Sequence, residues 1–341
     1  MNRFELCVGL WVIAVSVTSV WARDYRIIDA ENDSKIPSHF NDSKIPSHFS
    51  VFDRKADNFD MRAAYLSAVA TMAVSMGAGK DLLVENGFGQ VVEIENENGD
   101  PTLLMAANET MIFIVLTGEQ FSSINALWKY MQMGLEDVSR WGGEDVKIHT
   151  ECASTIDAVW GDLTKHLGRL GNDKEVWLAG HGIGGSLALL TGYRLAVEEV
   201  TRVSGIFTFG QPKVGDAIFS QHLKAVLKLN KDGSPVYRVV HSGDIVPRLK
   251  PPYVFSRTLV TDTLSPYDDI GSLVYLHRDG GYDVNPNHLE NIDANIFELK
   301  DFDNHSMYTY QKSLYECLAE DDQQQLPSPL RHARGKIGVR Y

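Results

Sequence analysis

The chain of 341 residues lacks the features that mark several common classes of protein. It has no Cys-x-x-Cys or His-Glu-x-x-His spacing and no cluster of histidine and cysteine, so we expect neither a metal site nor a cofactor. Lysine and arginine number 32 against 45 acidic residues, which gives a net charge of −13. Because an acidic chain repels a phosphate backbone, we expect no nucleic-acid partner.

Long apolar runs are also lacking, apart from one at the N-terminus. Leu6–Val20 is almost uncharged, but it is shorter than the about 20 residues that a membrane span needs. Small residues at Val20 and Ala22, just before Arg23, are typical of a cleavage site. We therefore expect residues 1–22 to be a signal peptide and the protein to be secreted or lumenal; an uncleaved anchor is the alternative.

Cysteine is scarce, with three residues, and Cys7 lies in the predicted signal peptide. In an oxidising compartment the other two, Cys152 and Cys317, leave two alternatives open: one disulfide, or two buried free thiols. A secreted chain also meets the glycosylation machinery, which modifies Asn-x-Ser/Thr sequons on surface loops. The candidate glycosylation sites are Asn32, Asn41 and Asn108.

The organisation of the chain changes at three places. Residues 23–50 contain a perfect tandem repeat, in which Asn32–Phe40 and Asn41–Phe49 both read NDSKIPSHF. Two copies are too few for a solenoid, so we interpret residues 23–50 as a surface leader with a local duplication. Residues 51–320 contain no linker-like stretch and are expected to form one domain. Residues 321–341, with a glutamine run and a basic end, predict a solvated tail.

Within the predicted domain, apolar runs typical of buried strands alternate with segments of helical period. The expected strands cover residues 111–116, 175–179, 206–209 and 236–240, and the expected helices cover 63–76, 152–170, 186–197 and 306–318. Continuous apolar strands that alternate with helices favour an α/β fold. The pattern predicts a mostly parallel central sheet with helices on both faces.

A glycine-rich turn, GHGIGG, follows the second predicted strand. Gly180, Gly182 and Gly185 match the dinucleotide-binding fingerprint. The acid that should end the next strand is misplaced, however, because Glu198 and Glu199 fall in or at the end of the intervening helix. The turn also matches the G-x-S-x-G nucleophile elbow, except that glycine replaces the serine. We favour the elbow and keep nucleotide binding as an alternative of another class.

At this turn the chain resembles the class 3 lipases, the filamentous-fungal type of triacylglycerol lipase, whose elbow reads GHSLGG. The resemblance extends from about residue 60 to 315 and includes Phe207–Asp216, His241–Arg248 and Asn304–Tyr308. These segments follow one another in the order that α/β-hydrolases use for nucleophile, acid and base. The resemblance implies an α/β-hydrolase fold with a lid-like helix.

The resemblance assigns Asp244 as the acid and His305 as the base of a catalytic triad, and it places Gly182 at the nucleophile position. Glycine has no side chain, so no acyl-enzyme can form there. Loss of a triad nucleophile costs on the order of 10⁶ in rate. The sequence therefore predicts that ester hydrolysis is absent or very weak.

The oxyanion hole that the resemblance implies is altered as well. Its donors would be the backbone N–H groups of Glu119 and Ile183, but Glu119 replaces a hydroxyl residue and Thr117 replaces an arginine. A carboxylate beside a developing negative charge opposes the transition state. Glu151 stands where the family has a glycine. Several departures together indicate a natural non-catalytic relative.

Residues 120–133 occupy the place of the family's lid. The apolar side chains at helical spacing there are Ile124, Leu127, Trp128 and Met131. The pattern fits either an amphipathic flap over an acyl-binding cleft, able to lie on a lipid interface, or an ordinary core helix. The position within the family favours the flap.

We therefore predict a secreted lipase-like protein of lipid metabolism, a pseudoenzyme that keeps an acyl-binding cleft. Its partners would be a lipid or fatty-acyl ester at the lipid–water interface, or an unidentified protein. The alternative is an active secreted carboxylic-ester hydrolase or triacylglycerol lipase, either as a variant of an active parent or through residual chemistry at His305.

Overall fold

A mixed sheet forms the centre of the computed structural model. The model describes residues 26–29, 48–52, 59–95, 101–118, 130, 133–171, 173–227, 236–248, 269–286 and 304–329. Within these residues the sheet has nine strands in the order β1-β2-β3-β4-β7-β8-β9-β10-β11. Their bounds are β1 Arg26–Asp29, β2 Gln90–Glu95, β3 Pro101–Ala107, β4 Met111–Leu116, β7 Glu175–His181, β8 Val203–Phe209, β9 Val236–His241, β10 Ser272–Leu276 and β11 Tyr282–Val284.

Strands β4, β7, β8, β9 and β10 run parallel to one another, whereas β1, β2, β3 and β11 are added in antiparallel fashion at the two sides. Every residue of β4 and of β8 is buried, as expected for parallel strands that are covered on both faces. A separate two-stranded sheet joins β5 (Leu135–Asp137) to β6 (Lys147–His149). The predicted α/β class with a mostly parallel sheet is confirmed.

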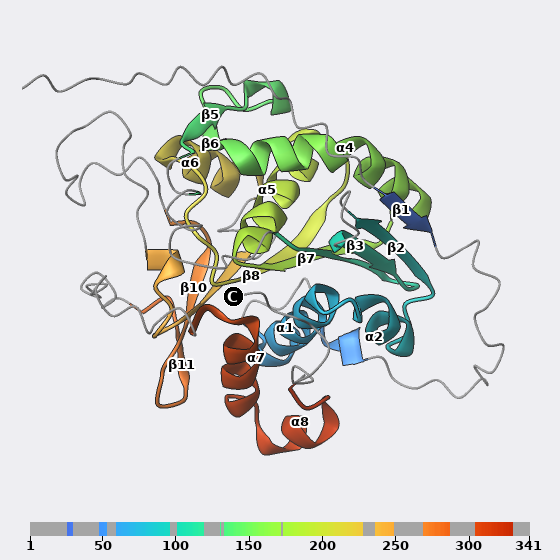
Figure 1. Cartoon of the computed structure of the whole chain (residues 1–341), viewed down its shortest axis with the longest axis vertical. Coiled ribbons are helices and arrows are strands. Elements are labelled where there is room, and N and C mark those ends of the chain that lie inside the picture. Colours follow the sequence, from blue (N-terminus) through green and yellow to red (C-terminus); the bar gives the residue numbers. More distant parts are fainter. Residues whose placement is uncertain are drawn as a thin grey trace, which may run out of the picture.

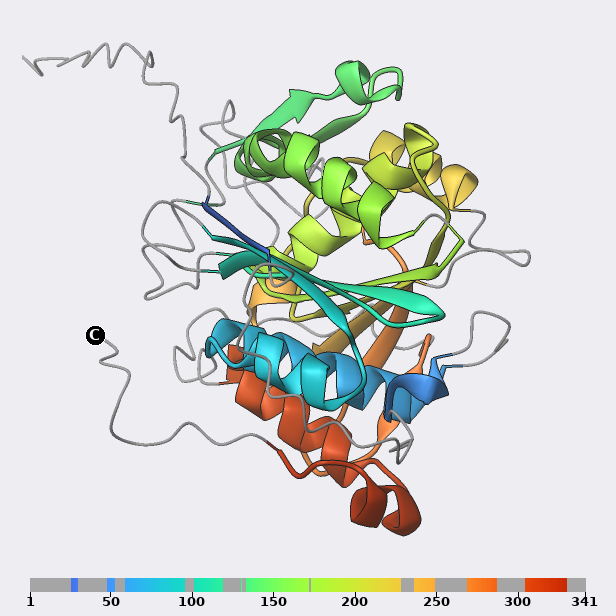
Figure 2. The same cartoon turned by 90° about the vertical axis from the view of Figure 1, so that its right-hand side faces the viewer.

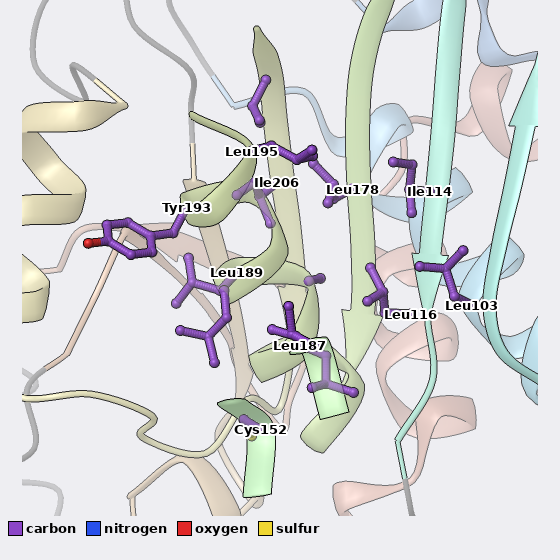
Figure 3. Packing of buried hydrophobic residues seen from close by; sticks show 14 of the residues in the cluster. Leu103, Ile114, Leu116, Cys152, Leu178, Leu187, Leu189, Tyr193, Leu195 and Ile206 are labelled. Carbon is purple, nitrogen blue, oxygen red and sulfur yellow. The ribbon is translucent and has the colours of Figure 1, made fainter. Parts of the chain in front are cut away.

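Helices cover both faces of the large sheet (Figures 1 and 2). One face carries α4 (Thr150–Leu170), α5 (Ile183–Val197) and α6 (Ala217–Val226), and the other carries α1 (Met61–Ser75), α2 (Gly79–Glu85) and α7 (Met307–Glu316). Each layer has its own hydrophobic core. Figure 3 shows part of the first core, with side chains of β3, β4, β7 and β8 packed beside α5.

The sheet also separates the two cysteines for which a disulfide was one alternative. Cys152 is buried in α4, where Tyr130 Oη lies 3.2 Å from its Sγ, and burial raises the pKa of this thiol to about 12. Cys317 caps α7 on the opposite face and is half-buried. Both are free thiols, so the disulfide alternative is wrong, because the helices that carry the cysteines cover opposite faces of the sheet.

Parts of the predicted leader and tail belong to the fold. β1 pairs with β2, and Phe49, the last residue of the second repeat copy, is buried in the short 3₁₀ helix His48–Val51. Its ring centroid lies 5.1 Å from that of Phe88 and 5.3 Å from that of Phe113. At the other end, α8 (Glu320–Gln325) begins the predicted tail, and Tyr65 donates a hydrogen bond to the carbonyl of Pro327.

Several sequence-based expectations lie outside the described residues. These are the signal peptide, the sequons at Asn32 and Asn41, and the lid positions Ile124, Leu127, Trp128 and Met131. Asn108 is described: it lies in the turn between β3 and β4, where its Oδ1 accepts the N–H groups of Thr110 and Met111. In the described part of the chain, no helix is both long enough and apolar enough to cross a membrane.

The burial of Phe49 predicts that one copy of the repeat is sufficient for the stability of the fold. Deleting residues 32–40 recreates the same junction, because the copies are identical, so we expect a change of no more than about 0.5 kcal/mol in the free energy of unfolding. Phe49→Ala should instead lower it by about 3–5 kcal/mol. Urea unfolding of the two variants measures both. A deletion as destabilising as Phe49→Ala would give the first copy a structural role.

Candidate functional site

Three loops meet at the carboxyl ends of the parallel strands. Gly182 directly follows β7, Asp244 follows β9, and His305 lies just before α7. In open α/β sheets this edge is where ligands bind, because the loops that leave neighbouring strands converge there. The structure brings all three sequence-predicted triad positions together at this edge.

Asp244 and His305 form a hydrogen-bonded pair. Nδ1 of His305 lies 2.9 Å from Oδ2 of Asp244, whose side chain is completely buried. The other carboxylate oxygen, Oδ1, accepts the backbone N–H of Val246 at 2.9 Å. Because the carboxylate accepts from Nδ1–H, it selects the tautomer in which Nε2 of the neutral ring is an acceptor.

Gly182 has the backbone of a nucleophile elbow. Its φ of 56° and ψ of −124° lie in a region that costs a non-glycine residue about 1–3 kcal/mol. A Cβ placed on it would lie 3.1 Å from Nε2 of His305 and 3.6 Å from Cε1. Position 182 therefore faces the imidazole as a nucleophile would, but it presents no reactive atom.

The neighbouring glycines set how closely the elbow approaches the sheet. A Cβ at Gly180 would lie 2.2 Å from the carbonyl oxygen of Gly184, and a Cβ at Gly184 would lie 2.4 Å from that of Leu116. Both approaches are far inside contact distance, so any side chain at either position would force the backbone apart. The glycine pattern is thus explained by the packing of α5 against β4 and β7.

This packing weakens the nucleotide-binding alternative. Its acid, Glu198, lies at the C-terminal end of α5, remote from the glycine turn. There its carboxylate accepts from Arg194 Nε at 2.6 Å and from Trp160 Nε1 at 2.9 Å. A bound ribose would need an acid at the end of β8, and Glu198 does not lie there.

Two side chains that the sequence analysis did not single out hold the pair in place. Tyr310, on α7, donates its hydroxyl to Oδ2 of Asp244 at 2.5 Å, and burial followed by the charge of Asp244 raises its pKa well above the usual value. It therefore stays protonated as a donor. Nε2 of His181 lies 2.6 Å from the carbonyl oxygen of His305, to which it donates. Tyr310 follows His305 by only five residues, and this closeness in the sequence was the one local signal for its role.

Gly210 is a third residue that shapes the site and that the sequence did not single out. It follows β8 with a φ of +57°, and a Cβ there would lie 2.7 Å from Oδ2 of Asp244 and 3.0 Å from Nδ1 of His305. Only glycine leaves room for the acid–base pair at this position. Its place in the FGQP stretch could have indicated this.

The predicted oxyanion hole is described in part. Ile183 opens α5, so its N–H belongs to the first turn, whose N–H groups have no acceptor within the helix. A Cβ at Gly118 would lie 2.7 Å from Cβ of Ile183, so the end of β4 adjoins this turn. Glu119 lies outside the described residues. Within the residues that the structure does describe, no three His, Cys, Asp or Glu side chains are grouped to hold a metal ion.

Comparison with known proteins finds a family match over part of the chain. Residues 113–254 match the model of the class 3 lipases, described as Lipase (class 3). A triacylglycerol lipase of Arabidopsis thaliana is 41% identical over 76 residues, which are 21% of this chain and 14% of the relative. A lipase of Rhizopus niveus is 38% identical over 117 residues, 31% of this chain and 27% of the relative. The matches thus span less than a third of the length of these curated relatives.

A solved structure supports the fold. The native Rhizomucor miehei lipase propeptide complex superimposes with a TM-score of 0.50 at 21% identity, and the match covers 64% of this chain and 69% of that one. The structural likeness bears on the architecture alone. It agrees with the α/β-hydrolase fold that the strand order and the elbow define.

The partly buried imidazole of His181 predicts an acid-sensitive site. Burial, followed by the charge of His305, lowers the pKa of His181 to about 3 from its usual 6.5. The folded state therefore binds this proton less readily than the unfolded state, so stability is full above pH 6.5 and falls as pH decreases toward 3. We expect His181 to contribute on the order of 2–4 kcal/mol to this loss.

Urea unfolding across this pH range tests the assignment. His181→Gln keeps a donor for the His305 carbonyl but does not titrate, so its stability should depend less steeply on pH. Equal slopes for His181→Gln and the parent chain would contradict the assignment.

Proposed function

We propose that this lipase-like protein of lipid metabolism, whose residues 113–254 match the class 3 lipase model, binds fatty-acyl lipids without hydrolysing them. One observation carries the proposal. The acid–base pair of Asp244 and His305 is complete, whereas the residue that faces it is Gly182. A Cβ at this position would lie 3.1 Å from Nε2 of His305, but glycine has none. The curated relatives in this family are named lipases, which supports a lipid as the ligand.

The chemistry of the site explains why hydrolysis should fail. In a triad, His305 would take a proton from the nucleophile while the nucleophile attacks the ester carbonyl, and Asp244 would stabilise the imidazolium that forms. At Gly182 no oxygen is held in position for that attack. What such a site retains, from binding and oxyanion stabilisation, is about 10³–10⁴ over the uncatalysed reaction.

An active ester hydrolase is the second candidate, and the intact pair favours it. His305 could act as general base on a water molecule in place of the serine hydroxyl. A water has to be recruited for each turnover and gives no acyl-enzyme, so we place this activity below binding. The predicted signal peptide supports a secreted protein that works at lipid–water interfaces.

Restoring the nucleophile distinguishes the two candidates. We expect the chain to be inert on emulsified triacylglycerol and on a short chromogenic ester, and Gly182→Ser to exceed it by at least about a thousand-fold. The serine variant should also lose about 1–3 kcal/mol of stability, because its backbone strain is no longer relieved by glycine.

Gly182→Ala is the matched control, since it adds the same strain without a hydroxyl and should remain inert. Asp244→Asn in the serine background should reduce activity about 10⁴-fold, as loss of the correct tautomer does in other triads. Turnover by the chain itself that His305→Ala abolishes would overturn the proposal in favour of the hydrolase.

A further inference from the structure

Two of the Asn-x-Ser/Thr sequons of the sequence lie among the described residues, at Asn108 and Asn304. Glycosylation attaches a bulky, hydrophilic oligosaccharide to the side-chain nitrogen, Nδ2, of the asparagine. A folded protein that carries such a glycan has to keep Nδ2 at the surface and out of its own hydrogen bonds. The structure separates the two sequons by this requirement.

Asn108 meets the requirement, because its side-chain contacts use the oxygen of the amide. Its Oδ1 accepts the backbone N–H of Thr110 at 2.9 Å, the hydroxyl of Thr110 at 3.3 Å and the backbone N–H of Met111 at 2.9 Å. Two backbone donors identify this atom as the oxygen. With the described residues Nδ2 forms no hydrogen bond, and the half-buried Asn108 is followed by two exposed residues, Glu109 and Thr110.

A glycan on Asn108 would preserve the turn between β3 and β4. The new bond joins Nδ2 to the first sugar, so Oδ1 keeps its lone pairs and its three hydrogen bonds. The backbone of the turn is closed separately, because the N–H of Asn108 donates to the carbonyl of Met111 at 3.0 Å. The modification therefore breaks no hydrogen bond of the turn.

Asn304 does not meet the requirement. Its Nδ2 packs against the loop that carries Asp244, since a Cβ at Gly243 would lie 2.5 Å from this nitrogen and 2.7 Å from Cγ of Asn304. The next residue, His305, is buried and bonded to Asp244. A sugar on Nδ2 would have to displace the backbone of Gly243 and with it the acid–base pair. We therefore expect Asn304 to be unmodified in the folded protein.

The turn that carries Asn108 lies at the edge of the sheet opposite to the site. The carbonyl of Thr110 accepts the N–H of Glu175, the first residue of β7, whereas Gly182 directly follows the last residue of β7. The seven residues of β7 extend over about 20 Å, at roughly 3.3 Å per residue. A glycan on Asn108 is therefore attached at the amino edge of the parallel strands, a full strand length from Gly182.

We propose that Asn108 is an N-glycosylation site, so that the amino edge of the sheet carries an oligosaccharide. The donor is a lipid-linked oligosaccharide pyrophosphate of the secretory pathway. The bond between its first sugar carbon and the pyrophosphate breaks, a bond from that carbon to Nδ2 of Asn108 forms, Nδ2 gives up one proton, and the lipid pyrophosphate leaves. The site rests on the secretion that belongs to the proposed function, and it is independent of lipid binding.

Production of the full chain in a eukaryotic host that secretes it tests the site. The Asn108 peptide of the secreted protein should carry a glycan, and enzymatic release should leave aspartate at position 108, which the peptide mass reports. The Asn304 peptide should be unmodified. Thr110→Ser should keep the glycan on Asn108, because serine also completes a sequon, whereas Thr110→Val and Asn108→Asp should lose it.

Thermal unfolding shows that the variants without the glycan are folded. Asn108→Asp keeps an acceptor for the N–H groups of Thr110 and Met111. After enzymatic release of glycans from both proteins, the parent chain has the same residue at position 108 as this variant. The two should therefore unfold at the same temperature, so a missing glycan in Asn108→Asp reports the loss of Nδ2 and not misfolding.

The outcomes separate this site from the proposed function. A secreted chain with an unmodified Asn108, or with a glycan on Asn304, overturns the assignment and leaves secretion and lipid binding as they are. A chain that stays in the cell without any glycan overturns the assignment together with the predicted secretion. The deglycosylated chain should bind lipid as the parent does, because Asn108 lies at the opposite edge of the sheet from His305.

Discussion

The close approach of α5 to β4 and β7 is the constraint on which the site depends. Helix α5 begins within one residue of the end of β7, and the contacts at Gly180 and Gly184 leave no room for side chains between helix and sheet. Most of α5 is buried, so the helix cannot move away to relieve a substitution. This packing holds residue 182 at the edge of the sheet, facing His305, whichever amino acid occupies that position.

The buried charge of Asp244 explains why the acid–base pair is complete in a chain without a nucleophile. The carboxylate accepts from His305, from Tyr310 and from the backbone of Val246. Removing one partner of a buried charge typically costs about 3–5 kcal/mol. Stability alone therefore favours retention of the two side chains. An intact pair is weak evidence for catalysis, whereas the residue at position 182 bears on it directly.

Sequence patterns predicted those features of the molecule that depend on residues close together in the chain. The continuous apolar run of β4 identified a strand covered on both faces, and the motifs located Asp244 and His305. Tyr310 was not found, because its role depends on a contact with Asp244 across 66 residues of sequence. The sequence left the pairing of the cysteines open for a related reason: the spacing of two cysteines does not record which face of a sheet their helices cover. Phe49 was placed in a surface leader because its aromatic partners lie elsewhere in the sequence.

The backbone conformation at position 182 favours glycine over a residue that could act as a nucleophile. An enzyme needs a side chain at position 182 and tolerates its backbone strain, whereas a binding protein is more stable with glycine there. With glycine present, the ring of His305 lies so close that a new Cβ would require a shift of a few tenths of an ångström. The packing around Gly182 therefore opposes a larger residue at this position, in addition to the backbone strain that such a residue would carry.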